Sequence, residues 1–186
     1  MSAPSSSWVS LRTPRLLLSP PTRADASLVL GLLSDSRTVA HNPSDGLDSP
    51  GEAAELVDRW RAQWQRYGFG YWCLRATADG SFIGYCGIKV VRFRNEEALN
   101  LVYRLVPQAW GRGLATEAAA AVVTWTAEHA PSRRLIARVR PENVASQRVA
   151  TKAGLQRDAT LDDEGEDGLD LVFTLPSSAA AENRDR

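Results

Sequence analysis

The chain has 186 residues, of which 44% are hydrophobic and 24% are charged. This composition excludes a disordered protein, and the length favours one soluble domain. Because 22 Lys and Arg residues balance 22 Asp and Glu residues, the net charge is zero, which argues against nucleic acid as a main partner. The sequence has neither a basic leader followed by an apolar run nor an apolar stretch of membrane-spanning length, so we expect a cytoplasmic protein without membrane contact.

Two short ends differ from the rest of the chain. Residues 1–7 are rich in Ser and Pro, and residues 176–186 form a polar tail, so both are expected to be disordered. Residues 8–175 are expected to form one domain. The two cysteines, Cys73 and Cys86, are too few for a disulfide framework and lack the spacing of metal ligands, so no metal is expected.

The first third of the chain predicts a strand and two helices. Residues 11–18 read as a strand, and a helix is expected over 22–34. Ser49-Pro50-Gly51-Glu52 is a stronger helix start, because Ser can cap the first amides, Pro suits the first helical position and Glu can reach back to the cap. Gly68 should end that helix.

A β-hairpin is predicted next, with strands over 71–77 and 82–91. Asp79-Gly80 at its centre suits a tight turn. A two-residue turn there places Cys73 opposite Cys86 in a non-hydrogen-bonded pair, with Cα atoms about 4.5 Å apart. A disulfide fits that distance, but the reducing cytosol favours free thiols.

The remaining elements alternate between strand and helix. The mixed order predicts an α+β fold, an α/β sandwich with helices on both faces of a central sheet. The expected elements are strands at 98–106, 135–140, 155–161 and 169–175, helices at 114–130 and 143–153, and an acidic turn at 162–167.

The segment Gln108-Ala109-Trp110-Gly111-Arg112-Gly113 lies between a strand and a long helix. Glycines at that point allow the backbone to approach a ligand closely, and the helix N-terminus offers free amides and positive potential to a pyrophosphate. A plain tight turn is the alternative. The spacing fits neither the dinucleotide-binding fingerprint nor a Walker loop.

Two motifs in this order resemble a known family. The run 107–118 resembles motif A, Q/R-x-x-G-x-G/A, of the GNAT superfamily of N-acetyltransferases, in particular its ribosomal-protein N-terminal acetyltransferase (RimJ/RimL-like) branch. Residues 143–155 are similar to the N-x-x-S-x-x-V-x-x-K-x-G-F/L helix of that branch. With Leu11–Leu16 and Ile83-Gly84, the resemblance covers about residues 9–175. It implies a mixed, mainly antiparallel GNAT sheet and acetyl-CoA as cosubstrate.

The resemblance also implies residue roles. Backbone groups of Leu105 and Val106 would bind the acetyl carbonyl and the pantetheine arm. Asn143 would hold the pantetheine, and Ser146 would donate a proton, directly or through water, to the leaving thiolate. Alternatively, Asn143 is only a helix cap and Ser146 a surface hydroxyl. The full set of expected cofactor contacts is Leu105, Val106, Gln108, Ala109, Trp110, Gly111, Arg112, Gly113, Leu114, Ala115, Thr116, Asn143 and Ser146.

The general base departs from the family pattern. Asn100 stands where the branch commonly has Glu, and an amide cannot take up a proton, although it could orient the amine or a water molecule. Glu96 lies on the same strand face by alternation and could act through water. His41, in a turn-like stretch, is a third candidate. An α-amine, with a pKa of about 7.7 to 8.0 against about 10.4 for lysine, needs no strong base.

These observations favour direct acetyl transfer from acetyl-CoA to a primary amine, with a protein N-terminal α-amine preferred from the branch resemblance. A small-molecule amine, such as a polyamine, an amino acid or an antibiotic, is the second hypothesis. Because of Asn100, a non-catalytic acyl-CoA-binding module is the third. Dimerisation is common in the family, so a homodimer is expected.

Overall fold

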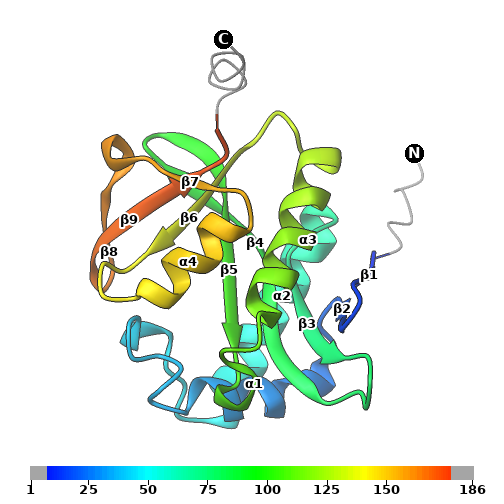
Figure 1. Cartoon of the computed structure of the whole chain (residues 1–186). Helices are drawn as coiled ribbons and strands as arrows, with labels where there is room; N and C mark the ends of the chain where they lie inside the picture. The colour runs from blue at the N-terminus through cyan, green and yellow to red at the C-terminus, as the bar shows by residue number, and fades with distance from the viewer. Residues whose placement is uncertain (1–7, 177–186) are drawn as a thin grey trace.

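The computed structural model describes residues 8–176, and the ends predicted to be disordered lie outside them apart from Pro176. Within this part of the chain, one mixed sheet has the strand order β1-β2-β3-β4-β5-β6-β9-β7, with β8 paired only to β9 (Figure 1). The strands are β1 (Leu11–Arg12), β2 (Leu16–Ser19), β3 (Tyr71–Ala76), β4 (Phe82–Phe93), β5 (Glu96–Leu105), β6 (Arg134–Val139), β7 (Gln156–Arg157), β8 (Asp163–Gly165) and β9 (Gly168–Thr174).

All neighbouring strands are antiparallel except β5 and β6. This arrangement confirms the expected mixed, mainly antiparallel sheet. The helices are α1 (Ala26–Leu33), α2 (Pro50–Tyr67), α3 (Leu114–His129) and α4 (Val144–Lys152).

Helix α2 begins and ends at the residues that the sequence indicates. The Ser49 side chain accepts a hydrogen bond from the Glu52 amide, and the Glu52 carboxylate accepts one from the Ser49 amide. Gly68 ends the helix in the left-handed conformation, with φ of 76°. These contacts satisfy backbone groups that a helix end leaves unpaired, so the boundaries follow from local chemistry.

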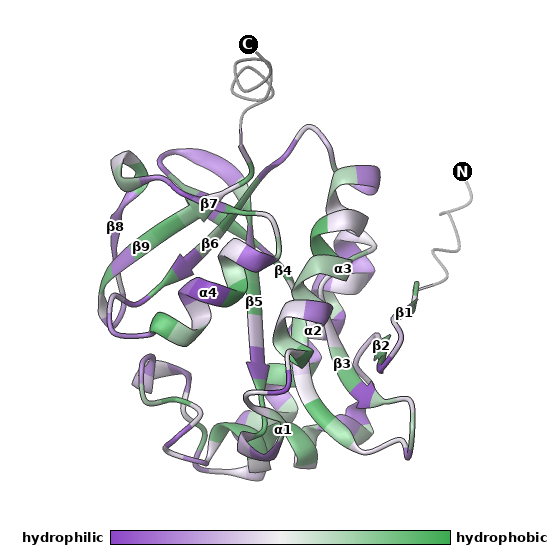
Figure 2. Ribbon diagram, viewed as in Figure 1, coloured by the Kyte–Doolittle hydropathy of each residue, from purple (hydrophilic) through white to green (hydrophobic). Residues whose placement is uncertain are grey.

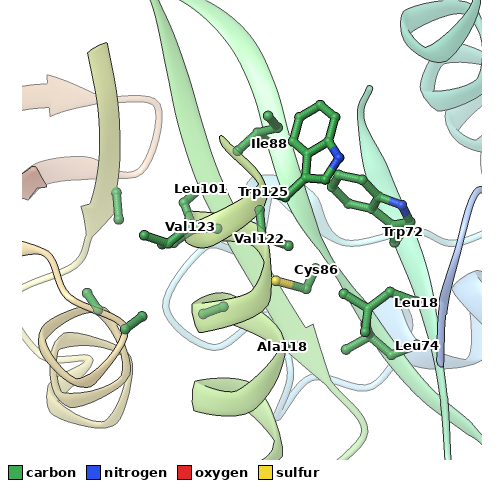
Figure 3. Packing of buried hydrophobic residues seen from close by; sticks show 14 of the residues in the cluster. Leu18, Trp72, Leu74, Cys86, Ile88, Leu101, Ala118, Val122, Val123 and Trp125 are labelled. Atoms are coloured by element: carbon green, nitrogen blue, oxygen red, sulfur yellow. The ribbon is translucent and has the colours of Figure 1, made fainter. Parts of the chain in front are cut away.

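The helices cover both faces of the sheet, as predicted. Helices α3 and α4 pack on one face, over a core that Figure 3 shows around Trp72, Cys86, Val122 and Trp125. Helices α1 and α2 lie on the other face, over a second cluster that includes Trp60 and Tyr85. Figure 2 shows apolar and polar residues alternating along the helices, as expected of elements with one buried side.

The two tryptophans of α2 are part of the packing. Trp60 contacts Tyr71 and Tyr85, and Trp64 is fully buried against Trp72. Since successive strand residues point to opposite faces, Tyr71 lies on the α1 and α2 side, whereas Trp72 lies under α3.

The predicted pairing of Cys73 with Cys86 is wrong. Cys73 pairs with Tyr85 and Cys86 with Trp72, so the two thiols point to opposite faces of the sheet, and both are free. The hairpin turn is longer than two residues, because the Ala76 amide bonds the Ser81 carbonyl around a four-residue loop. A bulge after Leu74 then moves the register back by one residue, so Cys73 lies one position away from its predicted partner.

The predicted strand over 155–161 is also wrong. Only Gln156–Arg157 pair with β9 before a 3-10 turn at Ala159–Leu161. The Asp158 side chain accepts from the Thr160 amide at 3.0 Å, which satisfies that amide locally and ends the strand. The acidic turn expected over 162–167 contains the short strand β8. Among residues 8–176, no helix is long and apolar enough to cross a membrane.

Candidate active site

Strands β5 and β6 form a V. They pair only where residues 98–100 lie beside 134–136, and beyond that point they diverge, as Figure 1 shows. At the vertex the Asn100 side-chain oxygen accepts a hydrogen bond from the Arg138 amide at 3.2 Å. Asn100 therefore replaces the backbone acceptor that the Arg138 amide loses where the strands part.

The backbone of β5 near its end faces the open part of the V. The Val106 amide donates to the Ile83 carbonyl of β4, so the amide and carbonyl of Leu105 point to the other side, toward β6. The Leu105 carbonyl accepts from the Trp110 indole Nε1–H at 2.8 Å. Of the two residues predicted to offer backbone groups, Leu105 presents a free amide to the gap, while the Val106 amide is engaged.

The loop after β5 has the shape of an anion site. The Ala109 and Trp110 amides are used inside the turn, bonded to the Val106 and Pro107 carbonyls. Gly111 and Gly113 then adopt left-handed φ values of 71° and 76°.

The start of α3 leaves further donors at the same place. The first intrahelical bond runs from the Glu117 amide to the Gly113 carbonyl, so the amides of Leu114, Ala115 and Thr116 have no partner inside the helix. Together with the helix dipole, these donors fit a pyrophosphate. The side chains of Gln108, Trp110 and Arg112 are exposed around the loop.

Arg15 fastens this loop to the β1–β2 turn. Its guanidinium donates to the Arg112 carbonyl at 2.8 Å and to the Glu117 carboxylate at 2.6 Å. Glu117 also accepts from the Thr13 hydroxyl at 2.6 Å and from the Arg15 amide at 2.9 Å. The sequence motif around Leu11–Leu16 carried no role for Arg15, although the structure places its positive charge beside Gly113.

We expect Glu117→Gln to lower the free energy of unfolding by about 1 kcal/mol at pH 7, a modest value because Arg15 is half-exposed. Burial raises the pKa of Glu117, but hydrogen bonds from Thr13 and Arg15 outweigh it and leave the pKa below 4.5. The stabilisation is therefore complete above pH 4.5 and is lost as the pH falls through the lowered pKa.

Urea denaturation of both proteins between pH 7 and pH 4 measures the difference. Glu55→Gln is the control, because Glu55 is an exposed carboxylate 4.0 Å from Arg59 on α2. Equal stabilities of wild type and Glu117→Gln at pH 7 would contradict the role given to the carboxylate.

The start of α4 meets β5 across the V. The Asn143 side chain accepts from the Ser146 amide at 3.0 Å, so Asn143 is the helix cap. The Tyr103 hydroxyl donates to the Ser146 carbonyl at 2.7 Å, and the Ser146 hydroxyl donates to the Tyr103 oxygen at 3.0 Å. Burial raises the pKa of Tyr103 well above its ordinary value, so its hydroxyl stays protonated.

Sequence reasoning gave Tyr103 no role. Its only signal was the strand alternation, which puts it on the same face as Leu101 and Leu105, toward α3 and α4.

The structure does not bring Glu96 to the open part of the V. Glu96 is the first residue of β5 and faces the same way as Asn100, but it lies four positions earlier in the strand, about 13 Å away along the chain. It lies beside a hollow of about 290 Å³ at the closed end, with Phe93 and Arg134. His41 is exposed in a turn. Among the described residues, no cluster of three or more His, Cys, Asp or Glu side chains is arranged to hold a metal ion.

A family model described as an acetyltransferase (GNAT) domain matches residues 15–156. Two curated proteins of Bacillus subtilis (strain 168) align over 151 residues, or 81% of this chain. The uncharacterized protein YkkB is 29% identical over 87% of its length, and the uncharacterized N-acetyltransferase YoaA is 24% identical over 85% of its length. A crystal structure of an acetyltransferase from Agrobacterium tumefaciens str. C58 is 28% identical, with a TM-score of 0.77 over 92% of this chain and 96% of that one.

More distant structures share the fold. RimL, a ribosomal L7/L12 α-N-protein acetyltransferase solved with coenzyme A, has a TM-score of 0.72 at 16% identity and covers 89% of this chain and 97% of its own. The family match spans most of the chain and includes both the loop before α3 and α4 itself. The chain therefore belongs to the GNAT family of acetyl-CoA-dependent N-acetyltransferases.

Proposed function

We propose that this enzyme transfers acetyl from acetyl-CoA directly to a primary amine, preferably the N-terminal α-amine of a protein. The V between β5 and β6 is the observation that carries the proposal. The pyrophosphate loop and α4 lie on the α3 side of the V, and the α1 and α2 side remains for the acceptor. A cosubstrate and an acceptor can thus meet in the gap from opposite faces of the sheet.

The loop amides of Gly111 to Thr116 hold the pyrophosphate in this proposal, and the Leu105 amide polarises the acetyl carbonyl. Acetyl-CoA supplies the activated thioester. As the amine attacks, an N–C bond forms and the C–S bond breaks, and the proton released by the amine ends on the thiolate. Asn143 holds the backbone amide of Ser146, and the Ser146 hydroxyl, which donates to Tyr103 in the structure, turns to that thiolate and relays the proton.

A covalent acetyl-cysteine step has no support in the structure. Burial raises the pKa of Cys73 to about 12, and that of Cys86 is raised further by burial. Neither thiol is therefore ionised at neutral pH, and only a thiolate is an effective nucleophile. Both side chains are buried in the sheet.

In this proposal the acceptor needs no general base, because part of the amine is already in its neutral, nucleophilic form at pH 7. At pH 7 roughly a tenth of an α-amine is already neutral, which leaves Asn100 to orient the amine rather than deprotonate it. RimL is named as an α-N-protein acetyltransferase, which favours the same kind of amine. The related fold of AAC(6')-Ib, solved with paromomycin and acetyl-CoA at 18% identity and a TM-score of 0.71, represents the small-molecule alternative.

We expect 1 mM acetyl-CoA to raise the thermal midpoint by about 5 to 11 °C if Kd is about 10 μM. We also expect thiol release with α-amine acceptors, with an acidic limb of kcat/KM that follows the amine's own pKa. Gly113→Glu should abolish the shift, because it places a carboxylate among the loop amides.

Gly80→Glu is the matched control, since Gly80 has nearly the same φ, 74°, in a remote hairpin turn. No thermal shift and no thiol release in the wild type would refute the proposal. An enzyme group with a pKa near 6 that disappears in Glu96→Gln would instead restore Glu96 as the base.

A further inference from the structure

Three arginines lie on the face of the V opposite the pyrophosphate loop. In β5, Leu105 packs toward α3, so the neighbouring Arg104 points to the other face. In β6, Ala137 packs toward α3, and Arg138 likewise points away. Arg140 follows directly after β6 and reaches the same side, where it joins Arg138 beside Asp170. Both arms of the V therefore contribute positive charge to the proposed acceptor side.

A set of carboxylates fixes these arginines in place. Asp45 accepts a hydrogen bond from Arg104 at 2.7 Å. It belongs to the segment between α1 and α2, residues 34–49, which lies below the open end of the V in Figure 1. The Asp170 carboxylate lies 3.0 Å from Arg138 and 3.7 Å from Arg140. Asp167, at the tip of the β8–β9 hairpin, accepts from both the amide and the hydroxyl of Ser44. The segment that contains Ser44 and Asp45 therefore contacts both β5, through Arg104, and the β8–β9 hairpin, through Asp167.

Hydrogen-bond donors exceed acceptors in this cluster. Arg104 Nη1, Arg138 Nε and Arg140 Nη1 are each buried and find no acceptor within residues 8–176. The carboxylates, by contrast, are already engaged by arginine or by Ser44. Unsatisfied buried donors are costly, and a guanidinium matches the two oxygens of a carboxylate. The side chains of Arg104, Arg138 and Arg140 keep 11%, 24% and 13% of their surface exposed, respectively. Because the three unpaired atoms are themselves buried, a ligand approaches through the exposed remainder of each side chain.

The cluster is adjacent to the place where the amine would react. Arg138 donates its backbone amide to Asn100 at the vertex of the V. Its side chain therefore starts from the point where the two strands part. On the other side, the rings of Tyr71 and Tyr85, whose centroids are 5.4 Å apart, lie near Arg104 and pack in the cluster under α1 and α2.

We propose that the acceptor carries a carboxylate close to its primary amine, and that Arg104, Arg138 and Arg140 bind this carboxylate while the amine faces Asn100. This inference rests on the proposed function. The same chemistry is present in the α-carboxylate of a free amino acid and in an acidic side chain next to a protein N-terminus. Polycationic amines are poor acceptors at this site, because within residues 8–176 the carboxylates beside the arginines, Asp45 and Asp170, are already paired with them.

The experiment compares acceptors that differ only in that charge. Two short peptides begin with serine and carry either aspartate or asparagine at the second position, and a free amino acid is compared with its amide. We expect kcat/KM to favour the carboxylate member by about tenfold or more, as for a charge-assisted hydrogen bond. A preference within the peptide pair assigns the carboxylate to an acidic N-terminal sequence, and one within the amino-acid pair assigns it to the α-carboxylate.

Variants of the arginines test whether these side chains cause the preference for acceptors with a carboxylate. Arg104→Gln and Arg140→Gln should each reduce the carboxylate preference to threefold or less. Arg92→Gln, at an exposed position of β4, should leave it unchanged. The acetyl-CoA thermal shift of each variant verifies that the fold and the cofactor site are intact. If Arg104→Gln does not fold, Arg140→Gln carries the test.

Failure of this inference is distinct from failure of the proposed function. Thiol release at equal kcat/KM for both members of both pairs overturns the inference and leaves the acetyltransferase proposal intact. If no amine releases thiol, the arginine site is tested by peptide binding, measured as the thermal shift that each peptide causes. A larger thermal shift with the aspartate peptide than with the asparagine peptide, lost in Arg140→Gln, supports the arginine site, and equal shifts overturn it.

Discussion

Gly84→Ala should lower the free energy of unfolding by at least about 3 kcal/mol, a loss of roughly 6 to 12 °C in the thermal midpoint. Gly84 has a φ of 140°, which L side chains rarely adopt. A Cβ atom there would overlap the Arg104 carbonyl oxygen and lie 2.8 Å from the Leu105 Cα atom. These are backbone atoms of the neighbouring strand, so they cannot rotate away as a flexible side chain can.

The same substitution should weaken acetyl-CoA binding in whatever folded protein remains. Gly84 pairs with Leu105, whose amide faces the V, so a displaced strand end moves that amide and the loop that follows. Thermal denaturation with and without acetyl-CoA measures both effects. A smaller midpoint gain from the cofactor than in wild type is expected.

Substitutions at two other glycines distinguish backbone strain from steric overlap as the cause of the destabilisation. Gly80 has a φ of 74° but nothing within 4 Å of a Cβ, so Gly80→Ala should cost only the backbone strain, about 1 kcal/mol. Gly31 lies inside α1 with open space around it, and Gly31→Ala should be neutral or slightly stabilising. If Gly84→Ala is as mild as Gly80→Ala, then β5 can move away from β4, and the close approach is not essential.

The sequence predicts those parts of this fold that depend on local chemistry. The cap at Ser49, the stop at Gly68 and the left-handed glycines before α3 each follow from residues next to one another in the chain. The alternation of helices and strands along the chain was enough to predict a central sheet with helices on both faces. The proposed pyrophosphate loop can be recognised in the sequence for the same reason, since its amides belong to one contiguous segment.

Features that depend on register or on distant segments were not predictable. The hairpin register at Cys73 depends on a bulge after Leu74 for which the sequence offers no signal. The turn between β4 and β5 places two non-glycine residues, Arg94 and Asn95, at φ values of 47° and 69°. The three arginines come from two strands that diverge, so alternation alone gives the face on which they lie but not their ion-pair partners, Asp45 and Asp170.

Asn100 illustrates both limits. The sequence shows an amide where the family commonly has a carboxylate, which casts doubt on a general base. Only the structure shows what the amide does, because its partner, the Arg138 amide, lies 38 residues away on the other arm of the V. Since its oxygen accepts that bond, Asn100 stabilises the point where the strands part. This geometry is compatible with an enzyme that relies on a substrate amine that is already neutral.

Ser146→Ala and Tyr103→Phe should each lower kcat by about 100-fold, the lower end of the range for positioned proton-transfer groups. The Ser146 hydroxyl and the Tyr103 hydroxyl form one hydrogen-bonded pair at 3.0 Å. A thiolate is a weaker base than an alkoxide, so Ser146 passes on a proton instead of losing its own outright. The loss should appear in kcat, with KM for the amine little changed, because the pair acts on the leaving group.

The double variant distinguishes a relay from two separate contacts. If the hydroxyls act as a unit, Ser146→Ala combined with Tyr103→Phe should be only slightly slower than either single variant. Thr151→Val is the control, since it removes a hydroxyl that donates to the Gln147 carbonyl on the exposed side of the same helix, and its kcat should stay within twofold of wild type. Additive losses would mean that the two hydroxyls act independently. Unchanged kcat in Ser146→Ala would assign Ser146 to capping and packing alone, and another group would then have to deliver the proton to the thiolate.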